Sequence, residues 1–201
     1  MTRLGFAPAV AASTAAVLLG SCASPPPPTT TPMRAGIDRR QGAEFVSARA
    51  FYGIPMLQKS FFWDGNGEVD TSGIGLHWGR FVRDHTALGL GTNLANWWTS
   101  GRDVQSVELE GTIRIYPKQG WPLFVGGNCG YQLANDQIPP GGTLWNFSFG
   151  FGAGLDVPIA AGTSALFGVD YHHISNALGH DSPRNPSQNE ARLWFGFGWT
   201  F

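Results

Sequence analysis

The stretch WNFSFGFGAGLDV, from Trp145 to Val157, alternates between two kinds of side chain. Its odd positions carry apolar residues, four of them aromatic, whereas its even positions carry Asn, Ser, Gly and Asp. Because successive side chains of a β-strand point to opposite faces, the pattern predicts a strand with one apolar face and one small, polar face. Lipid around a narrow barrel requires large apolar residues outside and small or polar residues inside. We therefore expect this strand to belong to a membrane β-barrel.

The C-terminal stretch repeats the alternation. From Ala191 to Phe201 the odd positions are all apolar, and the even positions hold Arg, Gly and Thr, with Trp194 as the exception. A soluble barrel of the lipocalin type would have the opposite sense, with apolar residues inside. The density of aromatic residues favours lipid outside. A chain that ends on Phe201 after an aromatic-alternating strand also resembles the C-terminal signal of outer-membrane barrels.

Eight strand-like runs, separated by turn signals, are predicted after residue 40. They cover about 43–52, 73–82, 85–97, 104–116, 122–133, 143–157, 163–176 and 189–201. Most of the short links between them alternate with longer ones, as short periplasmic turns and long outer loops would. The predicted short links lie near 83–84, 117–121 and 158–162, and the longer ones near 53–72, 135–142 and 178–188. The predicted fold is all-β: an eight-stranded antiparallel up-and-down transmembrane β-barrel over residues 41–201.

The composition agrees with a lipid-facing barrel. Charged residues make up 13% of the chain, about half of the ~25% found in soluble domains. The net charge of −1 gives a nucleic-acid partner no electrostatic support. No stretch after the N-terminal segment is a continuous apolar run long enough for a transmembrane helix, so a membrane would be crossed by strands.

Residues 1–22 have the features of an export signal, with Arg3 at the start and an apolar centre over about 9–19. The signal ends in Leu-Gly-Ser-Cys22, which resembles a bacterial lipoprotein box whose cysteine would be acylated. Ordinary cleavage after Ala23 stays open, since Ser-Cys-Ala also fits the small-x-small rule. A disulfide between Cys22 and Cys129 has little support. Residues 23–40 are rich in Pro and Thr, and we expect an extended tether without packed structure.

The seventh predicted strand ends in Tyr-His-His-Ile-Ser-Asn-Ala, residues 171–177. Residues two apart on a strand share a face, so His173 and Ser175 should project to the same side. A hydroxyl beside an imidazole is the start of an acyl-transfer site, and Glu190 offers a carboxylate to orient the imidazole. Since Asp170 should point inward, the pair should lie on the lipid-facing wall. That position suits a substrate that is itself a lipid.

The sequence His-Ile-Ser-Asn-Ala at 173–177, followed by Asn185-Pro186, Glu190 and a terminal aromatic strand, resembles the end of the PagL-type lipid A 3-O-deacylases. The match covers roughly the last thirty residues. The resemblance implies an eight-stranded outer-membrane barrel with a Ser-His-Glu triad on its outer surface. In this chain Ser175 would be the nucleophile, His173 the general base, Glu190 the residue that holds the imidazole, and Asn176 the oxyanion stabiliser. The implied reaction is hydrolysis of the ester-linked 3-hydroxyacyl chain at the 3 position of lipid A, without a metal or cofactor.

Glu190 falls on the same nominal face as Arg192, which should point inward. Either a bulge near Asn189 turns Glu190 outward, or the strand starts after Glu190. If neither holds, Asp181 is the next candidate for the acid. His172 faces away from the pair, and we expect it to make a hydrogen bond in the lumen.

The expected partners are lipid A or lipopolysaccharide as substrate and the outer membrane of a Gram-negative bacterium. A nucleic-acid partner is not expected, and a homodimer stays open. The alternative to the enzyme is a non-catalytic small outer-membrane barrel with a structural or adhesion role.

Overall fold

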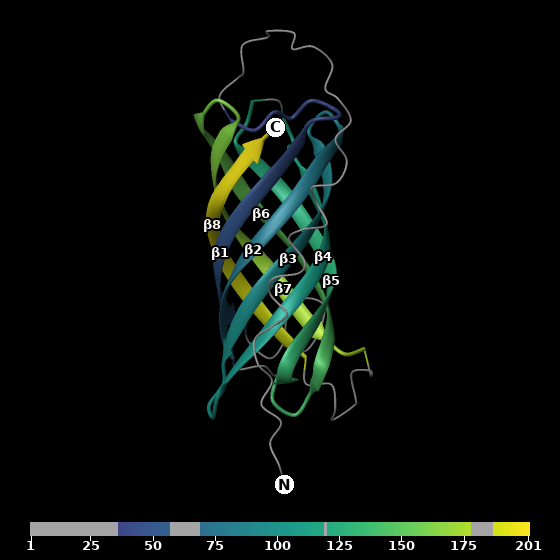
Figure 1. Cartoon of the computed structure of the whole chain (residues 1–201), viewed down its shortest axis with the longest axis vertical. Coiled ribbons are helices and arrows are strands. Elements are labelled where there is room, and N and C mark those ends of the chain that lie inside the picture. The colour runs from purple at the N-terminus through teal and green to yellow at the C-terminus, as the bar shows by residue number, and fades with distance from the viewer. Residues whose placement is uncertain (1–35, 57–68, 119, 178–186) are drawn as a thin grey trace. The chain divides into compact units, whose positions relative to one another are not determined.

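A computed structural model describes residues 36–56, 69–118, 120–177 and 187–201. The chain divides into two compact units, 1–32 and 33–201. All of the described residues belong to the second unit. This unit contains eight strands: β1 (Glu44–Pro55), β2 (Asp70–Arg83), β3 (Thr86–Trp98), β4 (Asp103–Ile115), β5 (Leu123–Ile138), β6 (Thr143–Ala160), β7 (Thr163–Ser175) and β8 (Gln188–Thr200). Each strand pairs antiparallel with its neighbour in sequence, and β1 pairs with β8, so the sheet closes into a barrel (Figure 1). The predicted eight-stranded antiparallel barrel is confirmed.

Within the described residues, no helix is both long and apolar enough to cross a membrane.

The barrel wall has an apolar outer face and a polar inner face. Leu90, Leu109 and Ile74 point outward and are 60–65% exposed. Buried polar and charged side chains fill much of the interior instead. In β6 and β8 the two faces are the ones that the alternation predicts, and the exposed set is the aromatic one. An apolar wall around a polar interior is the arrangement that a lipid environment stabilises.

Trp194 breaks the alternation of β8 because it fills the interior. Its side chain is only 8% exposed, and it packs against the backbone of Gly168 on the neighbouring strand β7. A Cβ at Gly168 would lie 2.1 Å from Cζ2 of the indole. The glycine therefore leaves the space that the tryptophan occupies.

The strands differ from the predicted runs mainly at the β5–β6 hairpin. β5 continues to Ile138, which pairs with Thr143 at the start of β6. The long loop predicted over 135–142 is therefore wrong: half of it is strand, and a tight turn remains at 139–142. β6 is also longer than predicted and continues to Ala160.

The barrel has two ends, which differ in their links. We call the end where β1, β3, β5 and β7 finish the loop end, and the opposite end, with the short links β2–β3 and β6–β7, the turn end. Near the turn end the interior holds a layer of aromatic rings with centroids 5.5–6.0 Å from their neighbours. The layer consists of Phe45, Phe81, Tyr116, Phe124 and Trp194. The charged side chains of the interior lie mainly on the loop-end side of this layer.

Residues 36–40, which we call the strap, pack against the turn end. Ile37 is 6% exposed, and its amide donates to Ser164 Oγ. Arg39 forms an ion pair with Asp156, which is fully buried, at 3.3 Å, and its guanidinium lies over the ring of Tyr116 at 3.9 Å. The expectation that the whole of 23–40 lacks packed structure is therefore wrong for its last five residues. An arginine that neutralises a buried carboxylate gives this part of the chain a fixed position.

Candidate active site

His173 and Ser175 lie on the outer face of β7, near its loop end. Phe167 and Val169 precede them on the same face and are each 48% exposed, whereas His172 and Ile174 point into the interior. His173 is itself only 3% exposed, and Ser175 is half-buried. The imidazole of His173 lies against an outward-facing ring of β6, since its centroid is 4.8 Å from that of Phe149. The structure thus brings the predicted imidazole and hydroxyl to one side of the wall. Their catalytic roles stay predictions.

Asn189 forms a hydrogen bond with the imidazole of His173. The two residues are directly opposite each other in the β7–β8 register. Nδ1 of His173 lies 2.7 Å from Oδ1 of Asn189, and the hydroxyl of Tyr171 donates to the same oxygen at 2.6 Å. An amide oxygen only accepts, so Nδ1 carries a proton.

Glu190 does not reach His173 in this structure. β8 begins at Gln188 and pairs with β7 without a register shift, so the strand has neither the bulge nor the late start that would turn Glu190 outward. Its carboxylate is fully buried in the interior, 2.8 Å from Nδ1 of His172. The prediction that Glu190 orients His173 is therefore wrong: successive side chains of a strand face opposite sides, and Asn189 has the outward position. Asp181, the other candidate, lies outside the described residues.

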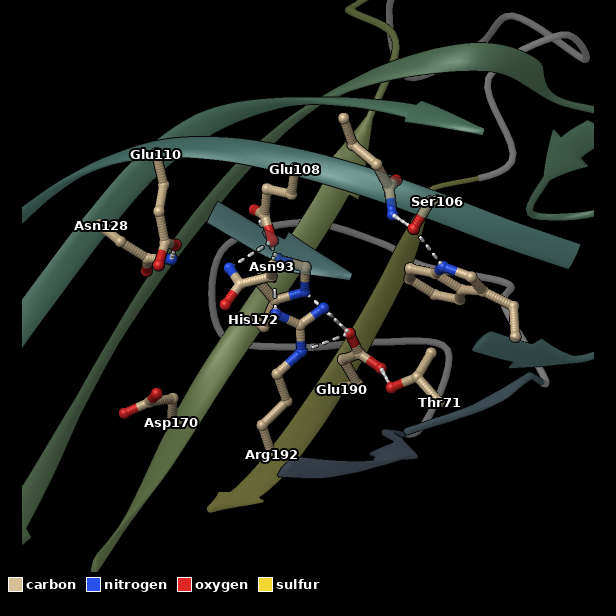
Figure 2. A network of polar contacts seen from close by, with 12 residues as sticks. Thr71, Asn93, Ser106, Glu108, Glu110, Asn128, Asp170, His172, Glu190 and Arg192 are labelled. Atoms are coloured by element: carbon tan, nitrogen blue, oxygen red, sulfur yellow. Dashed lines mark hydrogen bonds and ion pairs between the residues drawn. The ribbon is translucent and has the colours of Figure 1, made fainter. Parts of the chain in front are cut away.

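The interior network around Glu190 is shown in Figure 2. Glu190 accepts hydrogen bonds from Thr71 Oγ1 at 2.7 Å and from Nε of Arg192 at 2.9 Å, in addition to His172. The other ring nitrogen of His172, Nε2, lies 3.3 Å from Glu108, which is also 3.6 Å from Arg192. Both nitrogens of His172 thus face carboxylates and donate to them, so the ring is a cation. The network balances two negative charges with two positive ones.

A second charged cluster lies in the interior, closer to the turn end than the network around Glu190. Glu110 pairs with Arg49 at 3.1 Å and accepts from the amide of Asn128, and Arg49 also reaches Asp170 at 3.7 Å. A cavity of about 70 Å³ lies beside this cluster and the aromatic layer.

The expected hydrogen bond of His172 in the lumen is confirmed, since its side chain contacts the interior carboxylates Glu108 and Glu190.

Asn176, the predicted oxyanion stabiliser, directly follows β7. It is 2% exposed, and Ala177 after it has a left-handed φ of 57°. The chain therefore turns sharply just beyond Ser175, which is opposite Phe147 in the β6–β7 register. The role of Asn176 as an oxyanion donor stays a prediction.

No protein-family model and no curated protein sequence matches this chain. Among solved structures, the chain is similar to Neisserial surface protein A, with 12% identity, a TM-score of 0.58 and coverage of 80% of this chain and 100% of that one. It is also similar to the outer membrane protein OprG from Pseudomonas aeruginosa, with 14% identity, a TM-score of 0.50 and coverage of 81% and 97%. At these identities the likeness shows the fold alone, which is that of a small outer-membrane β-barrel.

Proposed function

We propose that this protein is a lipid A 3-O-deacylase of the outer membrane that hydrolyses the ester-linked 3-hydroxyacyl chain at the 3 position. The observation that carries the proposal is the placement of His173 and Ser175 on the lipid-facing wall, with a hydrogen bond already made to Nδ1 of the imidazole. Ser175 is half-buried on this outer face, so an acyl chain of a surrounding lipid would reach it from outside and would need no pocket in the barrel interior. The site lies near one end of the strands, where the ester groups of a lipid would also lie.

The chemistry follows from the two side chains. Oγ of Ser175 attacks the ester carbonyl carbon while its proton passes to Nε2 of His173. The tetrahedral oxyanion collapses, the C–O bond to the sugar breaks, and the imidazolium returns the proton to the leaving sugar oxygen. Water, deprotonated by the same imidazole, then hydrolyses the acyl-enzyme and frees the 3-hydroxy fatty acid. Asn176 would stabilise the oxyanion in both steps.

A second candidate is a non-catalytic small barrel with a structural or adhesion role. The observation that favours it is the interior position of Glu190, because the glutamate that the Ser-His-Glu pattern assigns to His173 contacts His172 instead. The two candidates differ in one measurable property, which is whether Ser175 is needed for loss of an acyl chain.

The test is mass spectrometry of lipid A after incubation with the full chain refolded in detergent. Wild type should remove one 3-hydroxyacyl unit, and Ser175→Ala should remove none. The matched control is Ser72→Ala, because Ser72 is also on the outer face near the loop end. Intact lipid A in every sample, with folding shown by circular dichroism, would contradict the proposal and favour the non-catalytic barrel.

A further inference from the structure

The cavity beside the second charged cluster is lined by side chains whose buried nitrogen atoms have no hydrogen-bond partner. Among the described residues, these atoms are Nε of Arg49, Nε2 of His77, Nη1 of Arg114 and Nε1 of Trp194, from β1, β2, β4 and β8. The buried side-chain oxygens without a partner in the same part of the chain belong to residues away from the cavity: Gln132, Ser148, Asp156 and Gln188. The cavity therefore gathers donors that lack acceptors.

Three of the four nitrogens can only donate. The guanidinium groups of Arg49 and Arg114 and the indole of Trp194 carry N–H groups and no acceptor. His77 differs, because its Nδ1 faces Oε1 of Glu110 at 3.3 Å, so that its Nε2 can donate only when the ring is a cation. A buried donor without an acceptor loses the hydration that it has in water. A molecule in the cavity that accepts hydrogen bonds would restore it.

The guanidinium of Arg114 also lacks a carboxylate. It lies over two rings of the aromatic layer, at 4.5 and 4.9 Å from their centroids. The two carboxylates that line the cavity, Glu110 and Asp170, face Arg49 instead, at 3.1 and 3.7 Å. Among the described residues, none forms an ion pair with Arg114. A cation inside a membrane-enclosed barrel is costly unless a negative charge lies beside it.

We propose that this cavity binds one small monovalent anion of the size of a halide, with Arg114 and Arg49 as its main ligands. One negative charge balances the one guanidinium that has no carboxylate, and an anion accepts a hydrogen bond from every donor around it. A water molecule would accept two hydrogen bonds at most and would bring no charge. The cavity volume of about 70 Å³ is large enough for such an ion, since one water molecule needs only ~10–15 Å³.

This inference goes beyond the proposed function and does not rest on it. The anion site lies in the interior, whereas His173 and Ser175 lie on the outer face of β7. Hydrolysis of lipid A and anion binding can therefore be tested separately, and the failure of one leaves the other standing.

The test uses the full chain refolded in detergent, with sodium gluconate exchanged stepwise for sodium chloride at constant ionic strength. Gluconate is the reference anion because it is too large for the cavity. An anion that binds only the folded state raises the urea midpoint of unfolding. The rise should be about 0.7 M for each tenfold increase in chloride above its Kd, for an m-value in the middle of the usual range.

Two variants locate the effect. Arg114→Met removes the charge and the donors but keeps a long side chain against the aromatic rings, so its midpoint should not respond to chloride. Arg80→Met is the matched control, because Arg80 faces outward on β2 and its side chain is 58% exposed. This variant should keep the full response.

Trp194 supplies a second readout that does not depend on unfolding. It lines the cavity, and bromide quenches tryptophan fluorescence as a heavy atom. Bromide bound in the cavity should quench Trp194 with saturation, whereas collisions with tryptophans on the outer wall quench in proportion to the bromide concentration. The saturable part should be displaced by excess chloride and should be missing from Trp194→Phe.

The outcomes decide between an anion and water. Equal midpoints in chloride and gluconate, or an equal rise in wild type and Arg114→Met, would overturn the proposal and leave water as the occupant of the cavity. If Arg114→Met does not fold, bromide quenching of the wild type decides by itself. Saturation that chloride displaces supports the anion site, and strictly proportional quenching overturns it.

Discussion

Replacing Glu190 with alanine should destabilise the barrel strongly and leave its chemistry almost unchanged. The carboxylate is fully buried and has three partners: Thr71 at 2.7 Å, His172 at 2.8 Å and Arg192 at 2.8 Å. Without it, Glu108 alone would balance two buried cations. Removing one partner of a buried ion pair costs about 3–5 kcal/mol of unfolding free energy. The imidazole of His172 can release its proton and relieve part of the imbalance, so we expect a loss of about 3 kcal/mol.

The loss can be measured by urea unfolding of the refolded chain in detergent, followed by tryptophan fluorescence. With an m-value of about 2 kcal/mol/M, the midpoint should fall by about 1.5 M urea. Glu44→Ala is the matched control: Glu44 faces outward at the turn end and pairs with Arg80 at 3.9 Å. An exposed pair of that kind contributes about 0–1 kcal/mol, so its midpoint should hardly move.

Activity in the folded fraction separates the two roles that have been considered for Glu190. As an interior network residue it should leave kcat of the folded protein within about threefold of wild type, whereas removal of a triad acid would lower kcat by orders of magnitude. A stability within 0.5 kcal/mol of wild type, well below the ~3 kcal/mol expected, together with a collapse of kcat, would refute the interior assignment.

Three further changes test other parts of the barrel. Leu109 points outward in the middle of β4 and is 62% exposed. If the wall faces a bilayer, Leu109→Arg should lower the free energy of unfolding in lipid vesicles by about 2–4 kcal/mol, measured with urea. No loss of stability would argue against lipid contact. Gly168→Ala should place a methyl group against Trp194 and lower the urea midpoint by about 0.5–1.5 M. Gly101→Ala, with no neighbour within 4 Å, should change it little. Arg39→Ala should lower the free energy of unfolding by about 2 kcal/mol, because the buried carboxylate of Asp156 loses a charged donor. Hydrogen exchange of the strap amides should become faster. Unchanged exchange by NMR would show that the ion pair does not hold the strap.

The fold can be predicted from the sequence because the side chains of a strand alternate between its two faces with a period of two residues. In β6 and β8 the alternation between aromatic and small or polar side chains sets which residues face out, and the abundance of exposed aromatics sets the sense of the barrel. The β5–β6 link was harder. Asn135-Asp136 looks like a turn, yet the backbone there continues as strand, since tertiary pairing outweighs local propensity.

Half of the candidate site was accessible by the same rule. His173 and Ser175 share a face whatever strand they pair with, because both belong to β7. The partner of the imidazole depends instead on the register between β7 and β8, which are joined by a link whose length the pattern leaves open. A shift of one residue exchanges Asn189 for Glu190. The parity with Arg192 places Glu190 on the inner face, but the resemblance to a Ser-His-Glu pattern favours the glutamate as the partner of the imidazole.

The packing of the strap cannot be predicted from the sequence, for a different reason. Pro and Thr before residue 36 predict an extended chain, and nothing in Gly-Ile-Asp-Arg-Arg indicates packing. Its contacts exist only once the barrel has closed, because they come from β6, β7 and β8. Such long-range contacts leave no periodic trace in the sequence.

The strap also bears on permeability. It spans the turn end from the β6–β7 link, where Gly36 bridges Ala161, to the β2–β3 link, where the backbone oxygen of Arg39 accepts from the amide of His85. Beneath it lies the aromatic layer, and beyond that layer lie the two charged clusters. A solute entering from the turn end would have to displace all three, so we expect the barrel to conduct neither ions nor small molecules. A lipid substrate would instead reach His173 and Ser175 by lateral diffusion within the membrane.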